Sequence, residues 1–128
     1  MKYICFGYLD QEKWATIPPA EQMAMMDRCF AYDDVLRKNG HWVHGEALQG
    51  PESTVTISRQ GGKAVVTDGP YAETKELLGG LLTIEARDLN HAVQLISNHP
   101  GTHMGRWEIR PAAELTRMIQ ESEKRRAG

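Results

Sequence analysis

The sequence has few of the features that mark specialised classes of protein. It contains only two cysteines in 128 residues, too few for a disulfide scaffold and without the spacing of a zinc site. It has no apolar run long enough to cross a bilayer, and Met1–Phe6 begins directly in a strand-like pattern rather than a signal-peptide layout. We therefore expect a cytoplasmic, bacterial-type protein in which Cys5 and Cys29 are buried free thiols.

An excess of charge of one sign is also absent. The 15 Lys and Arg residues are balanced by 17 Asp and Glu residues, so the formal net charge is -2 at pH 7. This balance creates no field that would attract nucleic acid or anionic lipid, and we exclude both as partners. With 41% hydrophobic and 25% charged residues, the composition is typical of a globular protein, and the length predicts one domain with one core.

Hydrophobic periodicity predicts strands that alternate with helices. Strands are expected at 2–8, 41–48, 81–86 and 105–110, helices at 19–39 and from 88 to 98, a hairpin at 54–67, and an amphipathic helix after 111. Without the hairpin the order is βαββαβ, which predicts a ferredoxin-like α+β fold with both helices on one face of an antiparallel sheet. The domain is expected to span 1–120, followed by a charged, frayed tail at 121–128.

The first long helix should pack on the sheet through an apolar stripe. Met23, Met26, Phe30 and Leu36 recur near helical spacing, and Asp33 is assigned to the opposite, polar face. Two helices leave the other face of the sheet open, so the tail helix, the hairpin or a second subunit must cover it. We predict a homodimer.

The densest polar stretch, Asp68–Gly80, reads DGPYAETKELLGG and lies between two expected strands. Long loops of this composition inside compact domains are often functional. We predict that Asp68, Lys75 and Glu76 are catalytic, as an acid and a base with pKa values separated by their environments, and that Tyr71 and Glu73 contact a ligand. In the alternative interpretation, the Asp forms a local turn and the charges pair within the loop.

Histidines provide further hypotheses. On a strand, His44 and Glu46 share one face, so His44 is a fourth catalytic candidate and Glu46 a ligand contact, while Arg110 could clamp a carboxylate. The spacings of His41 with His44 and of His99 with His103 occur in zinc sites. Strand alternation separates the first pair, and a Pro-Gly step breaks any helix in the second. We therefore expect no metal and no cofactor.

Asp68–Glu76, followed by LLGG, resembles the signature of the DGPF family within the YCII-related group, with Tyr71 in the place of Phe. The similarity extends to Gly40, to GEAL at 45–48 and to EIRP at 108–111. It implies a dimeric ferredoxin-like fold of the dimeric α/β-barrel type, with a cleft between helices, sheet and loop. It also implies an activity that is largely unassigned and genes often encoded beside extracytoplasmic-function sigma factors.

The wider YCII-related group includes proteins with a proposed pair made of a His on the first helix and an Asp before a Pro preceding the last strand. Here residues 19–39 contain no His, and His99 stands before Pro100. The resemblance therefore does not carry over the dehydrochlorination-type chemistry of some relatives. Two functions stay open: a cofactor-free lyase or isomerase for a small molecule in a cleft beside Asp68–Gly80, and a ligand-sensing or partner-binding module, linked to a sigma factor, that uses the same loop.

Overall fold

The computed structural model describes residues 1–71 and 74–128. The strands are β1 (Lys2–Asp10), β2 (Trp42–Ala47), β3 (Val55–Gln60), β4 (Lys63–Asp68), β5 (Glu76–Glu85) and β6 (Trp107–Pro111). The helices are α1 (Gln11–Ala15), α2 (Pro19–Lys38), α3 (Leu89–Ser97) and α4 (Leu115–Ala127), with short 3-10 turns η1 (Pro51–Ser53) and η2 (Pro100–His103). Among the described residues, no helix is long and apolar enough to span a membrane.

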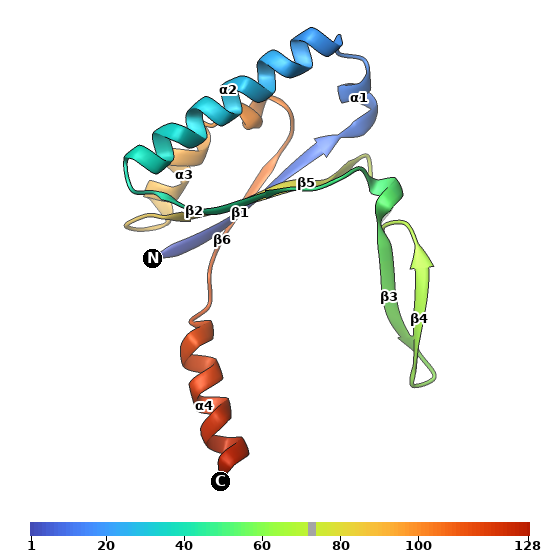
Figure 1. Ribbon diagram of the computed structural model, residues 1–128, viewed down its shortest axis with the longest axis vertical. Coiled ribbons are helices and arrows are strands. Elements are labelled where there is room, and N and C mark those ends of the chain that lie inside the picture. The colour runs from blue at the N-terminus through green and yellow to red at the C-terminus, as the bar shows by residue number, and fades with distance from the viewer. Residues whose placement is uncertain (72–73) are drawn as a thin grey trace.

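Four strands form an antiparallel sheet in the order β2-β5-β1-β6, and α2 and α3 cover one of its faces (Figure 1). This is the arrangement of the predicted ferredoxin-like α+β fold. The core lies between the helices and the sheet, because alternate residues of β1 and β5 point to the helix side. Its buried hydrophobic members are Tyr3, Cys5, Leu36, Leu82, Ile84, Ala86, Ala92 and Ile96.

Helix α2 begins at Pro19 and ends at Lys38, close to the predicted range 19–39, but it packs through a different face. Leu36 is 1% exposed and Asp33 is buried, whereas Met23 and Phe30 remain exposed. The assignment of Asp33 to the polar face is therefore wrong. A carboxylate on the buried side of a helix needs a partner, since an isolated charge away from water is costly.

Strand β2 carries a register irregularity between Trp42 and His44. Trp42 and Gly45 lie on the helix side, where the indole packs so closely that a Cβ at Gly45 would approach it to 2.6 Å. His44 lies on the other face with Glu46. The shared face of His44 and Glu46 is confirmed. Regular alternation would also place Trp42 on this face, but the irregularity puts it on the opposite one.

Strand β5 begins at Glu76 and is longer than predicted. Glu76–Gly80 therefore belongs to the sheet and pairs with Asp10, Leu9, Tyr8 and Gly7 of β1. Asp68 ends β4, and Gly69 has a φ of 91°, a left-handed conformation that favours glycine. Within the polar stretch Asp68–Gly80, only residues 69–75 therefore connect the two strands, and Glu73 lies outside the described residues.

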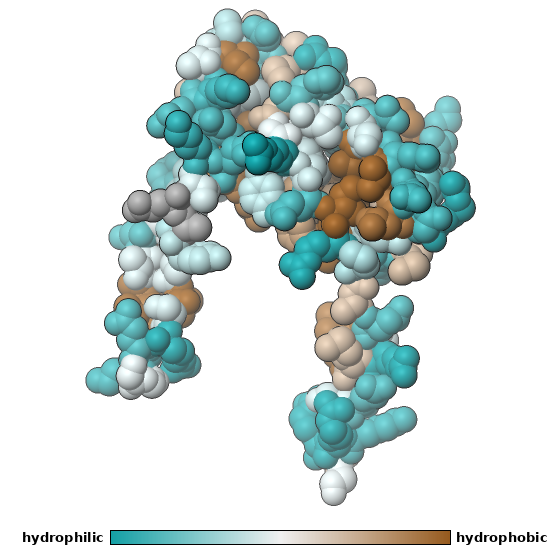
Figure 2. Space-filling model, turned by 180° about the vertical axis from the view of Figure 1, so that it is seen from behind, coloured by the Kyte–Doolittle hydropathy of each residue, from teal (hydrophilic) through white to brown (hydrophobic). Residues whose placement is uncertain are grey.

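Two segments, the β3–β4 hairpin and α4, extend from the side of the sheet that faces away from α2 and α3 (Figure 1). We call them the two arms. Both carry hydrophobic side chains into solvent (Figure 2): Ile57 and Val66 on the hairpin, and Met118 and Ile119 on α4, are all exposed. Helix α4 runs to Ala127, through most of residues 121–128, for which the sequence predicts a frayed tail.

Candidate functional site

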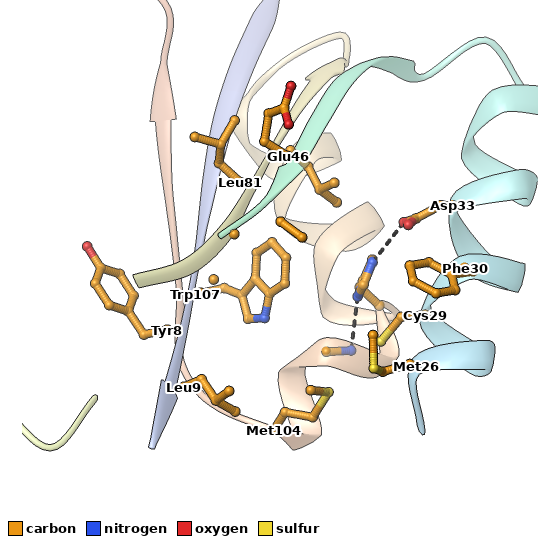
Figure 3. Close-up of a pocket in the computed structure, with 17 residues that line it drawn as sticks. Tyr8, Leu9, Met26, Cys29, Phe30, Asp33, Glu46, Leu81, Met104 and Trp107 are labelled. Carbon is orange, nitrogen blue, oxygen red and sulfur yellow. Dashed lines mark hydrogen bonds and ion pairs between the residues drawn. The ribbon is translucent and has the colours of Figure 1, made fainter. Parts of the chain in front are cut away.

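An apolar pocket of about 200 Å³ lies between α2, η2, the C-terminal ends of β1 and β2, and the middle of β5. Its lining side chains come mainly from hydrophobic residues: Leu9, Met26, Cys29, Phe30, Ala47, Leu82, Met104 and Trp107. Figure 3 shows that Tyr8, Glu46 and Leu81 also line it, but that their side chains point away from its interior. Asp33 is therefore the acidic side chain that faces the pocket.

Asp33 and His99 form a buried pair at the pocket wall (Figure 3). The Nε2 atom of His99 lies 2.9 Å from Oδ1 of Asp33, and the two side chains are 4% and 11% exposed for His99 and Asp33, respectively. One residue comes from α2 and the other from the turn that precedes η2. His99 is thus the partner that the buried Asp33 of α2 requires, because a hydrogen bond offsets the cost of removing the carboxyl group from water.

Hydrogen bonds and aromatic contacts hold the ring of His99 in place. Its Nδ1 atom accepts a hydrogen bond from the backbone N–H of Gly101 at 2.9 Å. Tyr32 meets the ring edge-on with centroids 5.4 Å apart, and the indole of Trp107 lies 5.1 Å away. Pro100 fixes the backbone at the start of η2, so the turn that presents Gly101 to the ring is pre-organised.

These contacts select one tautomer of His99. Because Nδ1 accepts from Gly101, it carries no proton, and the proton of the neutral ring resides on Nε2. Nε2–H then donates to Oδ1 of Asp33. Both ring nitrogens are engaged within the protein.

Trp107 forms one wall of the pocket because two glycines make room for it. A Cβ at Gly7 would lie 2.8 Å from Cζ2 of the indole, and one at Gly101 would lie 2.9 Å from the same atom. Contacts this short do not occur between real side chains. The shape of the pocket therefore depends on Gly7 and Gly101 as much as on the side chains that line it.

Cys29 lines the pocket one turn before Asp33 on α2. Burial, followed by the negative charge of Asp33, raises the pKa of its thiol above the ordinary value. The thiol is therefore a neutral, weakly reactive group at pH 7, as expected of a structural cysteine. Burial also raises the pKa of Cys5, in the core, to about 12.

Most of the residues that the sequence singles out lie elsewhere, in open grooves around the connection between β4 and β5. Asp68 and Lys75 border one groove with Gly69 and Pro70. Lys75 also borders a second groove with Tyr71 and Glu76. Asp68 and Lys75 are exposed, and Tyr71 is 90% exposed. These residues do not line the apolar pocket.

The second groove carries the polar contacts of this region. Glu76 lies 3.6 Å from the guanidinium of Arg106. Tyr8 and Glu108 share the groove, and a hydrogen bond to Glu108 raises the pKa of the Tyr8 phenol. Such exposed pairs are weak and solvated, which suits a surface that contacts a partner more than an enclosed reaction site.

The remaining predicted residues lie on the helix-free face of the sheet. His44 and Glu46 form a pair on β2, with His44 Nε2 3.0 Å from Glu46 Oε1, and both side chains are 60% exposed. Arg110 lies on β6, opposite Ile4 of β1. The sequence thus predicts the His44–Glu46 contact, but the structure does not bring that pair together with Asp68, Lys75 and Glu76.

Within 1–71 and 74–128, no three His, Cys, Asp or Glu side chains form a group that could hold a metal ion. His41 bonds through Nδ1 to the carbonyl of Glu85 at 3.0 Å, and His99 belongs to the pair with Asp33.

The sequence reasoning misses the Asp33–His99 pair. A signal for it was present: Cys29, Asp33 and Leu36 follow helical spacing, so the buried stripe could have included the Asp. His99 also occupies the place of the Asp in the proposed pair of the YCII-related group. The structure shows the same two residue types with their positions exchanged, the carboxylate on the long helix α2 and the imidazole before the proline.

Comparison with known proteins identifies the family. The profile of the YCII-related domain matches residues 1–116. The chain belongs to this family. An uncharacterised protein of Rhizobium meliloti (strain 1021) is 38% identical over 65 residues, which are 48% of this chain and 51% of that protein. The match thus spans about half of the length of that relative.

A solved structure shares the fold of this YCII-related protein. It is 5-chloro-2-hydroxyhydroquinone dehydrochlorinase (TftG) from Burkholderia phenoliruptrix AC1100, in complex with 2,5-dihydroxybenzoquinone. The two chains superpose with a TM-score of 0.52 at 13% sequence identity, over 88% of this chain and 94% of that chain. The likeness confirms the predicted ferredoxin-like α+β fold.

Proposed function

We propose that this YCII-related protein is a cofactor-free enzyme of the lyase or isomerase type that acts on a small molecule in the pocket beside α2. The observation that carries the proposal is the Asp33–His99 pair, a carboxylate held at 2.9 Å by a buried imidazole at the wall of an apolar pocket. Apolar pockets with a few oriented polar groups are the usual form of small-molecule sites. A carboxylate in such a site is suited to acid–base chemistry.

The size of the pocket and the fold relationship support this proposal. A cavity of roughly 150 Å³ is enough to hold a benzene molecule, so about 200 Å³ suits one six-membered ring. TftG, which shares the fold, is a dehydrochlorinase whose structure contains a ring compound. The proposal assigns the chemistry to Asp33 in place of Asp68, Lys75, Glu76 and His44.

A thermal-shift screen of small ring metabolites tests the proposal with a matched pair of variants. Asp33→Asn removes the charge inside the pocket, and Asp34→Asn removes the charge of the next residue, whose side chain is 77% exposed. A substrate should raise the melting temperature of the wild type and of Asp34→Asn, but not of Asp33→Asn. Turnover of the same compound, followed by NMR, then demonstrates catalysis. A compound that stabilises all three proteins equally would count against the pocket.

The exposed stretch around Asp68 and Lys75 supports a second candidate function, a recognition surface. On the basis of residues 68–76 we place the chain in the DGPF subfamily, whose members are often encoded beside extracytoplasmic-function sigma factors. A cytoplasmic module that binds such a factor would use a surface of this kind rather than an enclosed site. Co-expression with an extracytoplasmic-function sigma factor from the same organism, followed by size-exclusion chromatography, provides the test. Co-elution that is lost in Lys75→Ala is expected, and separate elution of the wild-type proteins would refute it.

We also propose that the protein is a homodimer in which the arms of each copy contact the other. Lone two-stranded hairpins and helices of about 13 residues are marginally stable in water, so both arms need a partner surface. Helix α4 carries 4 basic and 2 acidic side chains, whereas the rest of the chain carries 11 and 15. A basic arm is therefore attracted to the acidic body of a second copy.

The family domain is proposed to extend to residue 120.

A further inference from the structure

Asp33 and His99 have different roles in the pocket, and their hydrogen bonds indicate which residue has which. We infer that Asp33 accepts a proton from the substrate and that His99 is a positioning residue. We further infer that the substrate is an uncharged molecule of the size of one six-membered ring, which presents a hydroxyl group or an acidic C–H to Asp33. This inference rests on the proposed function, because it names the substrate class and the acceptor atom of the same site.

His99 is unsuited to accept the proton. A general base needs a lone pair within reach of the substrate. The lone pair of Nδ1 is occupied by the N–H of Gly101, and Nε2 carries the proton donated to Asp33. Tyr32 and Trp107 pack against the ring, so rotation of the imidazole toward the pocket would displace both. The ring is built to stay in place.

Asp33 retains a free acceptor. Its Oδ1 atom bonds to His99, and among the described residues no hydrogen bond engages Oδ2. No buried side-chain nitrogen or oxygen of the described chain lacks a partner, so Oδ2 reaches open space, and Asp33 lines the pocket. One carboxylate oxygen is thus anchored inside the protein, and the other keeps exposed surface and is available to a ligand.

The lining of the pocket selects the charge of the ligand. No Lys or Arg side chain lines the pocket in the part of the chain that the structure describes, and Asp33 supplies a negative charge. A carboxylate or phosphate group would enter without a counter-ion, next to a like charge. A hydroxyl group loses less on leaving water and can donate to Oδ2. The apolar walls formed by Phe30, Met104 and Trp107 suit the ring itself.

The proton balance of the reaction follows from this geometry. Oδ2 of Asp33 takes the proton of the substrate O–H or C–H bond and becomes a carboxylic acid, while the electron pair of the broken bond stays on the substrate as an enolate. The acid then returns the proton to another carbon in an isomerisation, or to the departing group in an elimination. Throughout, Nε2–H of His99 donates to Oδ1 and keeps the carboxyl group oriented.

Three ring compounds test the substrate class by isothermal titration or NMR titration. They are 2-hydroxycyclohex-2-enone, which is uncharged and carries a hydroxyl donor, its O-methyl ether, which has no donor, and cyclohex-1-ene-1-carboxylate, which is an anion. We expect the hydroxy-enone to bind at least tenfold more tightly than the other two compounds, because a hydrogen bond to a charged group strengthens affinity on the order of tenfold or more. Equal binding of the ether, or preferred binding of the anion, would overturn the substrate class.

Two variants test the division of roles. Asp33→Asn removes the acceptor charge, and His99→Gln keeps an N–H donor for Oδ1 but removes the titratable ring. We expect Asp33→Asn to bind the hydroxy-enone at least tenfold more weakly and His99→Gln to bind it within about threefold of the wild type, with an unchanged pH dependence. A loss in His99→Gln equal to that in Asp33→Asn, with both variants shown to be folded by their thermal unfolding, would make His99 the acceptor.

Exchange of the ring C–H protons of the hydroxy-enone with deuterated solvent separates this inference from the proposed function. If the wild type and His99→Gln accelerate the exchange and Asp33→Asn does not, the result supports both this inference and the proposed function. Donor-selective binding without accelerated exchange would leave the ligand class standing and refute the enzyme. Exchange that is abolished in His99→Gln would support the enzyme and overturn the assigned roles.

Discussion

Oδ1 of Asp33 and Nε2 of His99 lie 2.9 Å apart, although 66 positions separate the two residues in the chain. The contact links α2, in the first half of the βαββαβ order, to the turn that follows α3, in the second half. It therefore links α2 to the segment that leads into β6, the last strand of the sheet.

This contact should contribute strongly to stability. Asp33→Ala leaves the Nε2–H of His99 buried without an acceptor, and we expect the free energy of unfolding to fall by about 3 kcal/mol. Asp34→Ala is the matched control, because its side chain pairs with Arg37 at the surface and should cost less than about 1 kcal/mol. Urea unfolding of the two variants provides the measurement. Equal losses would mean that the buried Asp33–His99 contact contributes no more to the free energy of unfolding than the exposed Asp34–Arg37 contact does.

The close packing of Trp107 on Gly7 should also be measurable. In Gly7→Ala the new methyl group would lie 2.8 Å from the indole, which must shift, and we expect a loss of about 1–3 kcal/mol. Gly79→Ala is the matched control on β5, since the nearest atom to its Cβ, in Leu9, is 3.6 Å away. The same unfolding experiment applies. A Gly7→Ala protein as stable as Gly79→Ala would show that Trp107 moves without cost.

The raised pKa of the Cys29 thiol predicts its reactivity. The thiolate is the reactive form, so a pKa raised by burial lowers the thiolate fraction at neutral pH. We expect iodoacetamide to label Cys29 more slowly than free cysteine at pH 7.5. The labelling rate of Cys29 should also begin to rise at a higher pH than the labelling rate of free cysteine. Cys5, with a pKa of about 12, should remain unlabelled in the folded protein. Peptide mass spectrometry distinguishes the two sites.

A pocket ligand should protect Cys29 from the same reagent, because the thiol lines the pocket. Cys29→Ala provides the control for labelling elsewhere. If a ligand found in the thermal-shift screen left the labelling rate unchanged, it would bind at another site.

The proposed dimer predicts different effects for adjacent residues on α4. Ile119 is on the apolar side of the helix and Gln120 is not, so Ile119→Glu and Gln120→Glu add the same charge to opposite sides. We expect light scattering to give a dimer for the wild type and for Gln120→Glu, and a weakened or monomeric species for Ile119→Glu. Ile57→Glu and Ser58→Glu form the same comparison on the hairpin, where neighbours point to opposite faces.

Three outcomes bear on the dimer. A wild-type monomer would refute it. A dimer that tolerates Ile119→Glu and Ile57→Glu would show that the arms are not part of the interface. A monomer in which Ile119 is protected from solvent would mean that α4 folds back onto its own sheet.

The order of the elements could be predicted because its signals are local. Asp88 caps α3 by accepting from the N–H of His91, and Gly61 and Gly62, both with positive φ, form the hairpin turn. Each of these signals lies within a few residues of the feature that it determines. The fold class follows once the elements are in order.

The site could not be predicted in the same way, because its key contact joins distant positions. Asp33 is flanked by Tyr32 and Asp34, and its neighbours in sequence do not reveal that a histidine from another element faces it. Polar density instead predicts a site at Asp68–Gly80, although Glu76–Gly80 belongs to strand β5. Local composition indicates where charges are concentrated, but burial of a single charge depends on tertiary packing.

The sheet order sets the sequence of events when the protein folds. Strand β1 pairs with β5 and β6, and β2 pairs with β5, so each early strand depends on a partner synthesised much later. Closing such long loops is entropically costly and slow compared with forming local pairs such as the β3–β4 hairpin. On the ribosome, the first half of the chain must therefore wait without its sheet partners, and it is exposed during that time to aggregation and proteolysis.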